Sequence, residues 1–151
     1  MKIILMRHGQ AEAYQQADNI RQLTPLGHQQ AKQTAEYLLS LYQPDFFVVS
    51  PYDRAQQTLA ALSTQLPEVP VSVHDNITPS DDAREALTGL ADVTAECLVV
   101  VCHMSIIAKL AALLIGETPE SFALAEARVF EMDFVAADMA KEVDRFVPAQ
   151  S

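Results

Sequence analysis

The chain has 151 residues, of which 50% are hydrophobic, and it carries a formal net charge of −10 at pH 7. This length and composition predict one globular domain over residues 1–151 and exclude a disordered chain. The acidic balance excludes nucleic acid and anionic membrane as main partners, because both require a basic surface.

Residues 3–5 form a short apolar run that predicts a buried strand over residues 2–6. Arg7, His8 and Gly9 follow it directly, so an imidazole is expected at a strand end. Glycine permits a sharp turn there and lets a bulky anion approach the backbone. This strand end is the first candidate for a binding site.

Residues 11–22 are polar and show no helical period, so we expect a loop over the strand end that contains Arg21. Thr24 is a typical N-cap, and Pro25 suits the first position of a helix. The sequence therefore predicts a helix that begins at Pro25 and ends before Pro44.

Residues 46–49 predict a second buried strand. Ser50 and Pro51 resemble the preceding cap and proline, so they predict a second helix whose apolar face extends to Leu66. Arg54 then lies in the first turn, where free N–H groups already favour anions.

The next segments predict a short strand over residues 69–74, a loop over 76–82 and a helix over 85–92. Residues 98–102 are the most apolar strand and are expected near the centre of the sheet. His103 follows at its carboxyl end, as His8 follows the first strand.

Residues 105–115 predict a helix closed by Gly116. Residues 127–134 and 142–147 predict two more strands, the second at a sheet edge, and the final residues are expected to be loose. Helices that alternate with strands predict a three-layer α/β/α sandwich around a mostly parallel central sheet.

The two cysteines, Cys97 and Cys102, are not spaced as a metal or redox motif. Both lie in or beside an apolar run, which favours buried thiols and a reducing, cytoplasmic location. The sequence shows no secretory signal and no apolar segment long enough to cross a bilayer.

Two histidines at equivalent strand ends can form one site, because ligands of open α/β sheets bind beyond the carboxyl ends of the strands. Arg7 and Arg54 can join His8 and His103 there. One such histidine is usually structural, but two at equivalent strand ends, with two arginines able to join them, are harder to explain as structural residues. The sequence resembles the histidine phosphatase superfamily, also called phosphoglycerate mutase-like, over about residues 2–116, through Arg7-His8-Gly9, Leu23-Thr24-Pro25-Leu26-Gly27-His28-Gln29-Gln30-Ala31, Ser50-Pro51-Tyr52-Asp53-Arg54-Ala55-Gln56-Gln57-Thr58 and Val101-Cys102-His103.

Within that superfamily, the chain is most similar to the small bacterial phosphohistidine phosphatases of the SixA type. The interval between Thr58 and His103 must hold a strand, a helix and another strand, which leaves little length for the lid of larger members. Arg21 also matches an arginine that these small enzymes place near the phosphate.

This resemblance implies that His8 is the nucleophile and that Arg7, Arg21, Arg54 and His103 bind the phosphoryl group. It implies a phosphohistidine intermediate on His8 and no metal or other cofactor. It further implies that the substrates are phosphohistidine-bearing proteins, namely phosphotransfer domains of sensor kinases in two-component signalling or phosphocarrier proteins.

The general acid of many superfamily members has no clear counterpart in this chain. Asp81, Asp82 and Glu85 are candidates, although aspartates at a helix start are more typical of caps. An alkoxide needs a proton donor to leave, whereas an imidazole can leave as a neutral group. We therefore expect a protein phosphohistidine phosphatase; the alternatives are a broad-specificity phosphatase or mutase for small phosphate esters, and a module that binds phosphohistidine without cleaving it.

Overall fold

The computed structural model describes residues 1–13 and 17–151. Its centre is a six-stranded sheet of order β3-β2-β4-β1-β5-β6. The predicted loop over 11–22 includes residues 14–16, which lie outside the described residues. The strands and helices are β1 (Lys2–Arg7), the 3-10 helix η1 (Asp18–Ile20), α1 (Pro25–Leu41), β2 (Phe46–Val49), α2 (Asp53–Ser63), β3 (Val71–Val73), α3 (Ala83–Ala91), β4 (Cys97–Cys102), α4 (Ile106–Ile115), β5 (Ala127–Glu131) and β6 (Lys141–Phe146).

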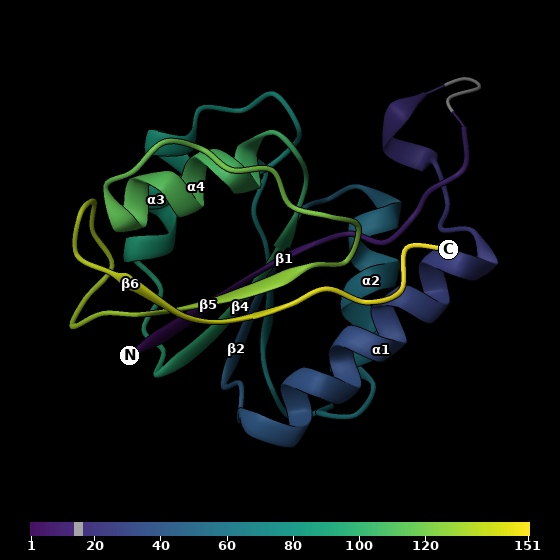
Figure 1. Ribbon diagram of the computed structural model, residues 1–151, viewed down its shortest axis with the longest axis horizontal. Coiled ribbons are helices and arrows are strands. Elements are labelled where there is room, and N and C mark those ends of the chain that lie inside the picture. Colours follow the sequence, from purple (N-terminus) through teal and green to yellow (C-terminus); the bar gives the residue numbers. More distant parts are fainter. Residues whose placement is uncertain (14–16) are drawn as a thin grey trace.

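The helices cover both faces of the sheet, which confirms the predicted mixed α/β architecture (Figure 1). Ile3 and Leu5 belong to a buried cluster with side chains of α3 and α4, while Ile4 and Met6 belong to a second cluster with α1 and α2. Alternation along a strand places successive side chains on opposite faces. Because both faces are covered, β1 reads as a continuous apolar run.

The sheet is mostly parallel. β4 pairs in parallel with both β1 and β2, and β2 pairs in parallel with β3. β5 and β6 add an antiparallel side, with β6 at the edge as predicted. The carboxyl ends of β1, β2 and β4 therefore meet at one edge of the sheet.

Helix ends explain one success and one error of the sequence analysis. Thr24 caps α1 as predicted, with its hydroxyl oxygen accepting the Gly27 N–H at 3.0 Å. The prediction that Ser50 caps the second helix is wrong: Tyr52 is the N-cap of α2. The Ser50 hydroxyl lies within reach of the Tyr52 N–H and of His103 instead. Ser50, which has the sequence pattern of a helix cap, therefore contacts His103 and does not cap α2.

Other predictions about buried groups and the chain end have mixed outcomes. Cys97 and Cys102 are buried free thiols, as expected, and burial raises their pKa values to about 11 and about 12. The expectation of a loose C-terminus is wrong, because the Gln150 side chain exchanges hydrogen bonds with the backbone of Leu124. The last residues are attached to the body of the fold.

Candidate functional site

Strand register brings the two predicted histidines together. Arg7 is paired with Cys102 in the ladder between β1 and β4, so the next residue of each strand is a histidine. The His8 N–H donates to the Cys102 carbonyl at 3.1 Å, and the two imidazole centroids lie 5.2 Å apart. Both rings are buried, His8 at 6% and His103 at 0% exposure.

His8 is held in one tautomer. Its Nδ1 lies 2.7 Å from the Gly9 carbonyl oxygen, which can only accept, so Nδ1 carries the ring proton and Nε2 has a free lone pair. Burial, reinforced by Arg54 and Arg7, lowers the pKa of His8 to about 4, against the opposing effect of the Gly9 carbonyl. The ring is therefore neutral at pH 7, with Nε2 unprotonated.

His103 is held from its other side. Its Nε2 lies 2.7 Å from the Ser50 hydroxyl oxygen, which also accepts the Tyr52 N–H at 3.2 Å. Burial, followed by the proximity of His8 and Arg54, lowers the pKa of His103 to about 3. If the Ser50 hydroxyl donates to Nε2, the ring proton lies on Nδ1, and this Nδ1–H is the one group without a hydrogen-bond partner. If Nε2 instead carries the proton and donates to the hydroxyl oxygen, both the Nδ1 lone pair and the hydroxyl hydrogen lack a partner. The first arrangement is therefore favoured.

Arg54 is the second residue of α2 and is 2% exposed. Its Nε donates toward His8 Nε2 at 3.4 Å, and its Nη1 donates to the Asp18 carbonyl at 2.6 Å. Its Nη2 lies 3.1 Å from the Asp18 carboxylate. The guanidinium thus lies directly beside the His8 lone pair.

Arg21 reaches the site through Asp18. The Arg21 Nε donates to the other oxygen of the Asp18 carboxylate at 2.9 Å, and its Nη1 donates to the Glu12 carbonyl at 2.9 Å. Partial burial alone would raise the pKa of Asp18, but hydrogen bonds from Arg54 and Arg21 outweigh it and lower the pKa. One ionised carboxylate therefore joins two of the predicted arginines.

Arg7 supplies the third guanidinium. Its Nη1 donates to the Phe122 carbonyl at 2.8 Å. Among the described residues, the buried side-chain nitrogens and oxygens without a hydrogen-bond partner are Arg7 Nε and His103 Nδ1. Unsatisfied buried polar atoms are rare, and two in one site indicate donors that await a ligand. The ligand that suits donors surrounded by guanidinium groups is a tetrahedral oxyanion.

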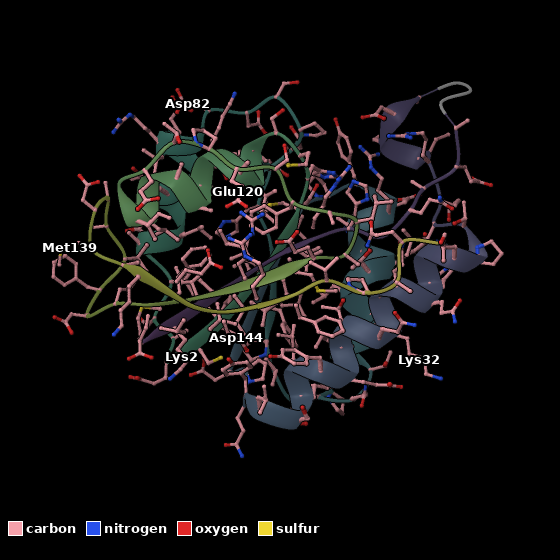
Figure 2. All side chains as sticks on the ribbon, viewed as in Figure 1. Lys2, Lys32, Asp82, Glu120, Met139 and Asp144 are labelled. Carbon is pink, nitrogen blue, oxygen red and sulfur yellow. The ribbon has the colours of Figure 1, made fainter. Side chains whose placement is uncertain are left out.

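Two of the three general-acid candidates, Asp81 and Asp82, have structural partners elsewhere. Asp82 is the N-cap of α3, accepting the Arg84 N–H at 2.8 Å, and Asp81 accepts the Thr78 N–H at 2.8 Å. Asp81 and Asp82 line a cavity of about 730 Å³, and neither His8 nor His103 is among the residues that line it. Figure 2 shows Asp82 beyond α3 at the margin of the molecule. The cap interpretation of Asp82 is confirmed.

Across residues 1–13 and 17–151, no group of three His, Cys, Asp or Glu side chains is arranged to hold a metal ion. None of the helices in the same ranges combines the length and apolar character needed to span a membrane.

Comparison with known proteins identifies the family. The chain belongs to the histidine phosphatase superfamily (branch 1), whose model matches residues 3–78. It is 32% identical over 136 residues to the phosphohistidine phosphatase SixA homolog of Haemophilus influenzae, covering 81% of this chain and 82% of that protein. It is 32% identical over 129 residues to phosphohistidine phosphatase SixA of Escherichia coli, covering 81% and 80%. The solved structure of the protein histidine phosphatase SixA complexed with tungstate is 26% identical, with a TM-score of 0.89 over 98% of this chain and 97% of that one.

Sequence reasoning missed three contacts of this site. Asp18 lies in the polar loop, where an acidic residue three positions before Arg21 was the only available signal. Ser50 was assigned to a helix cap. Thr58, within the quoted motif, accepts the Gly9 N–H at 3.1 Å and so ties α2 to the turn after His8.

Proposed function

We propose that this protein is a protein phosphohistidine phosphatase that transfers the phosphoryl group of its substrate to His8 and then to water. The observation that carries the proposal is the position of the His8 Nε2 lone pair beside the guanidinium of Arg54, with the unpartnered donors Arg7 Nε and His103 Nδ1 in the same site. The kinship with two phosphohistidine phosphatases supports the same substrate class.

In the first step, the phosphoryl oxygens bind Arg7, Arg54 and His103, with Arg21 at the outer side. His8 Nε2 attacks phosphorus while the bond from phosphorus to the substrate imidazole nitrogen breaks, and that nitrogen keeps the electron pair. Charge on the transferring group is spread over its oxygens, so positioned cations supply most of the catalysis. The substrate imidazole, protonated on its other nitrogen, leaves as a neutral ring.

In the second step, water attacks the phosphorus of phosphorylated His8. The bond to Nε2 breaks, Nε2 recovers its lone pair, and inorganic phosphate is released with both protons of the water on its oxygens. The Gly9 carbonyl keeps the proton on Nδ1 throughout, so His8 returns to its starting tautomer.

The substrate class also follows from the leaving group. Asp81 and Asp82 are engaged at the start of α3 and line a cavity apart from the histidines. A substrate that leaves as neutral imidazole needs less from a general acid than an alcohol does. This supports phosphotransfer domains of sensor kinases and phosphocarrier proteins as substrates. We place the reaction in the cytoplasm, where such proteins occur and where the free thiols of Cys97 and Cys102 would stay reduced.

The test compares phosphate release from a phosphorylated histidine phosphotransfer domain by wild type, His8→Ala and His28→Ala. His28 is exposed on α1 and serves as the matched control. We expect His28→Ala to behave as wild type and His8→Ala to lose at least about 10³-fold, as nucleophile removal does in other covalent enzymes. Rapid alkaline quench should trap phosphate on His8 of wild type.

Two outcomes would contradict the proposal. Equal release by wild type and His8→Ala would remove His8 from the reaction. Faster turnover of sugar phosphates or phosphoglycerates than of phosphohistidine would replace the substrate class with small phosphate esters.

A further inference from the structure

A buried amide on α1 contacts the turn that follows the first histidine. Gln30 is 0% exposed. Its Oε1 accepts the Gln10 N–H at 2.9 Å, and its Nε2 donates to the Ala149 carbonyl at 3.1 Å. The two partners fix the orientation of the amide, because the N–H needs an acceptor and the carbonyl needs a donor. A buried amide satisfied at both ends has one stable orientation.

The Gln10 N–H belongs to the same peptide group as the Gly9 carbonyl. A trans peptide is planar, with its N–H and C=O pointing in opposite directions. A hydrogen bond that holds the Gln10 N–H therefore also sets the direction of the Gly9 oxygen. That oxygen accepts from His8 Nδ1 at 2.7 Å.

We infer that Gln30 is a positioning residue for His8, and that the C-terminal residues 148–150 hold Gln30 in its working orientation. The inference rests on the proposed function, because it gives the tautomer of His8 a role in the reaction. Gln30 touches no reacting atom. It acts through the Gly9–Gln10 peptide, which keeps the ring proton on Nδ1 and leaves the lone pair on Nε2.

The tail connects two parts of the site, so we name residues 148–150 the strap. In Figure 1 the yellow C-terminal segment runs from β6 past α2 to end beside α1. The Ala149 N–H donates to Gln33 Oε1 at 3.0 Å, one turn beyond Gln30 on α1. On the other side, Gln150 Oε1 accepts the Leu124 N–H at 3.2 Å, and its Nε2 donates to the Leu124 carbonyl at 3.1 Å.

The segment that the strap holds also touches His8. The Ala125 N–H, next to Leu124, donates to the His8 carbonyl at 3.0 Å. The Phe122 carbonyl, two residues before Leu124, accepts from Arg7 Nη1. The strap thus joins α1, which orients the His8 ring through Gln30, to the segment that holds the backbone of His8 and the side chain of Arg7.

The test uses two substitutions at one position. Gln30→Glu keeps an oxygen for the Gln10 N–H, whereas Gln30→Met keeps the length of the side chain and removes both hydrogen bonds. Nitrogen-15 NMR of the histidine rings distinguishes a proton on Nδ1 from one on Nε2. We expect His8 to carry its proton on Nδ1 in wild type. The Nε2–H form should be populated partly in Gln30→Glu, which keeps the acceptor for the Gln10 N–H but loses the contact to Ala149, and most in Gln30→Met.

The kinetic readout is the single-turnover rate of His8 phosphorylation by phosphoramidate, a small N-phosphate donor. Loss of a group that orients a histidine through a hydrogen bond typically costs 10–100-fold, so we expect a decrease of about that size in Gln30→Met. Gln29→Met is the matched control, because Gln29 is exposed on the same helix, and it should leave both tautomer and rate unchanged.

The strap is tested by truncation after Val147 and by Gln33→Ala, which removes only the acceptor of the Ala149 N–H. Both should increase the Nε2–H population of His8, with a smaller effect in Gln33→Ala. Folding is checked by thermal denaturation, and Gln33→Ala still decides the question if the truncated chain unfolds.

A Gln30→Met protein that keeps the Nδ1–H tautomer, or that reacts at the wild-type rate, would overturn the role of Gln30. Wild-type tautomer populations in Gln33→Ala would overturn the role of the strap. Failure of the proposed function is distinguishable, since wild type would then form no phosphohistidine on His8 while the tautomer measurement would still report on Gln30.

Discussion

The Ser50 hydroxyl lies 2.7 Å from Nε2 of His103. The other ring nitrogen, Nδ1, has no hydrogen-bond partner and is available to the site. His8 is held through its other nitrogen: Nδ1 donates to the Gly9 carbonyl, and the Nε2 lone pair faces the guanidinium of Arg54. One ring thus offers a lone pair and the other offers a proton. A phosphoryl group between them would meet a nucleophile and a hydrogen-bond donor.

The first prediction concerns this hydroxyl. Ser50→Ala removes the contact that holds the His103 proton on Nδ1, so the site loses a donor to the phosphoryl oxygens. We expect kcat for phosphohistidine to fall by about 10²-fold, the lower range for loss of one oxyanion donor, with a smaller change in KM. Steady-state kinetics measure the separate effects on kcat and KM. Ser50→Thr should restore most of kcat because it keeps the hydroxyl. A larger effect on KM than on kcat would contradict this role.

The second prediction concerns the pH dependence of the two histidines. Burial is the main cause that lowers the pKa of His8 to about 4 and that of His103 to about 3, so both rings stay neutral well below the ordinary value near 6.5. The NMR titration of the folded protein should show both midpoints below pH 5. The same protein in urea should titrate near 6.5. Midpoints near pH 6 in the folded protein would contradict the burial of the two rings as the cause of their lowered pKa values.

The sign of the stability change follows from these shifts. Between pH 6.5 and about 4, the unfolded chain binds protons on His8 and His103 while the folded chain does not. The free energy of unfolding therefore falls as pH falls through this window, by at most about 1.4 kcal/mol per pH unit for each histidine. Urea unfolding of His8→Asn should show a shallower pH dependence than wild type over the same window.

The third prediction concerns two glycines at different kinds of position. A Cβ added to Gly27 would lie 2.0 Å from the Gln10 carbonyl oxygen, and the backbone there is tied to Thr24 and Gln30. We expect Gly27→Ala to lower the free energy of unfolding by about 2 kcal/mol or more, as overpacking against backbone does. Urea denaturation is the measurement.

Gly89 provides the control because it lies within α3 and its added Cβ would meet nothing closer than Asn76 Nδ2 at 3.5 Å. Gly89→Ala should raise stability by roughly 0.5–1 kcal/mol, since alanine is the better helix former. Equal destabilisation by both substitutions would show that the close approach of Gly27 to Gln10 carries no special cost.

The sequence predicted what depends on local pattern. Apolar runs located the strands that end at His8 and His103, and the order of elements implied that these ends share one edge of the sheet. Their register could not be read, because the pairing of Arg7 with Cys102 depends on contacts across the whole sheet. The start of the predicted second helix selected Arg54, and the resemblance to a known family added Arg21, yet neither gave a sign that one carboxylate joins them.

Polar residues with two possible partners were the ones misread. Ser50 precedes a proline and fits a helix cap equally well, and only the position of His103 decides between the two roles. The tail was expected to be loose because terminal polar residues usually are. Its acceptors and donors, Gln33 and Leu124, lie far from it in sequence, so no local pattern could indicate the attachment.

The last prediction concerns Asp18, whose carboxylate contacts both Arg21 and Arg54. An incoming phosphate must share these guanidinium groups with a negative charge already present. Asp18→Asn keeps an oxygen of similar position and removes the charge, so inorganic phosphate should inhibit the variant more strongly. We expect its inhibition constant to fall about two- to fivefold, because a partly exposed ion pair contributes up to about 1 kcal/mol.

Asp53→Asn is the control for this prediction. Asp53 lies beside Arg54 in sequence, and its carboxylate accepts from Gln22 Nε2 at 2.8 Å rather than from an arginine. The substitution makes the same change in net charge without altering an arginine contact, so it should move the inhibition constant less than Asp18→Asn does. If both variants bind phosphate equally more tightly, the effect is a general one of net charge. If Asp18→Asn binds phosphate more weakly than wild type, the carboxylate serves mainly to orient the two guanidinium groups, and competition with the ligand is not its dominant effect.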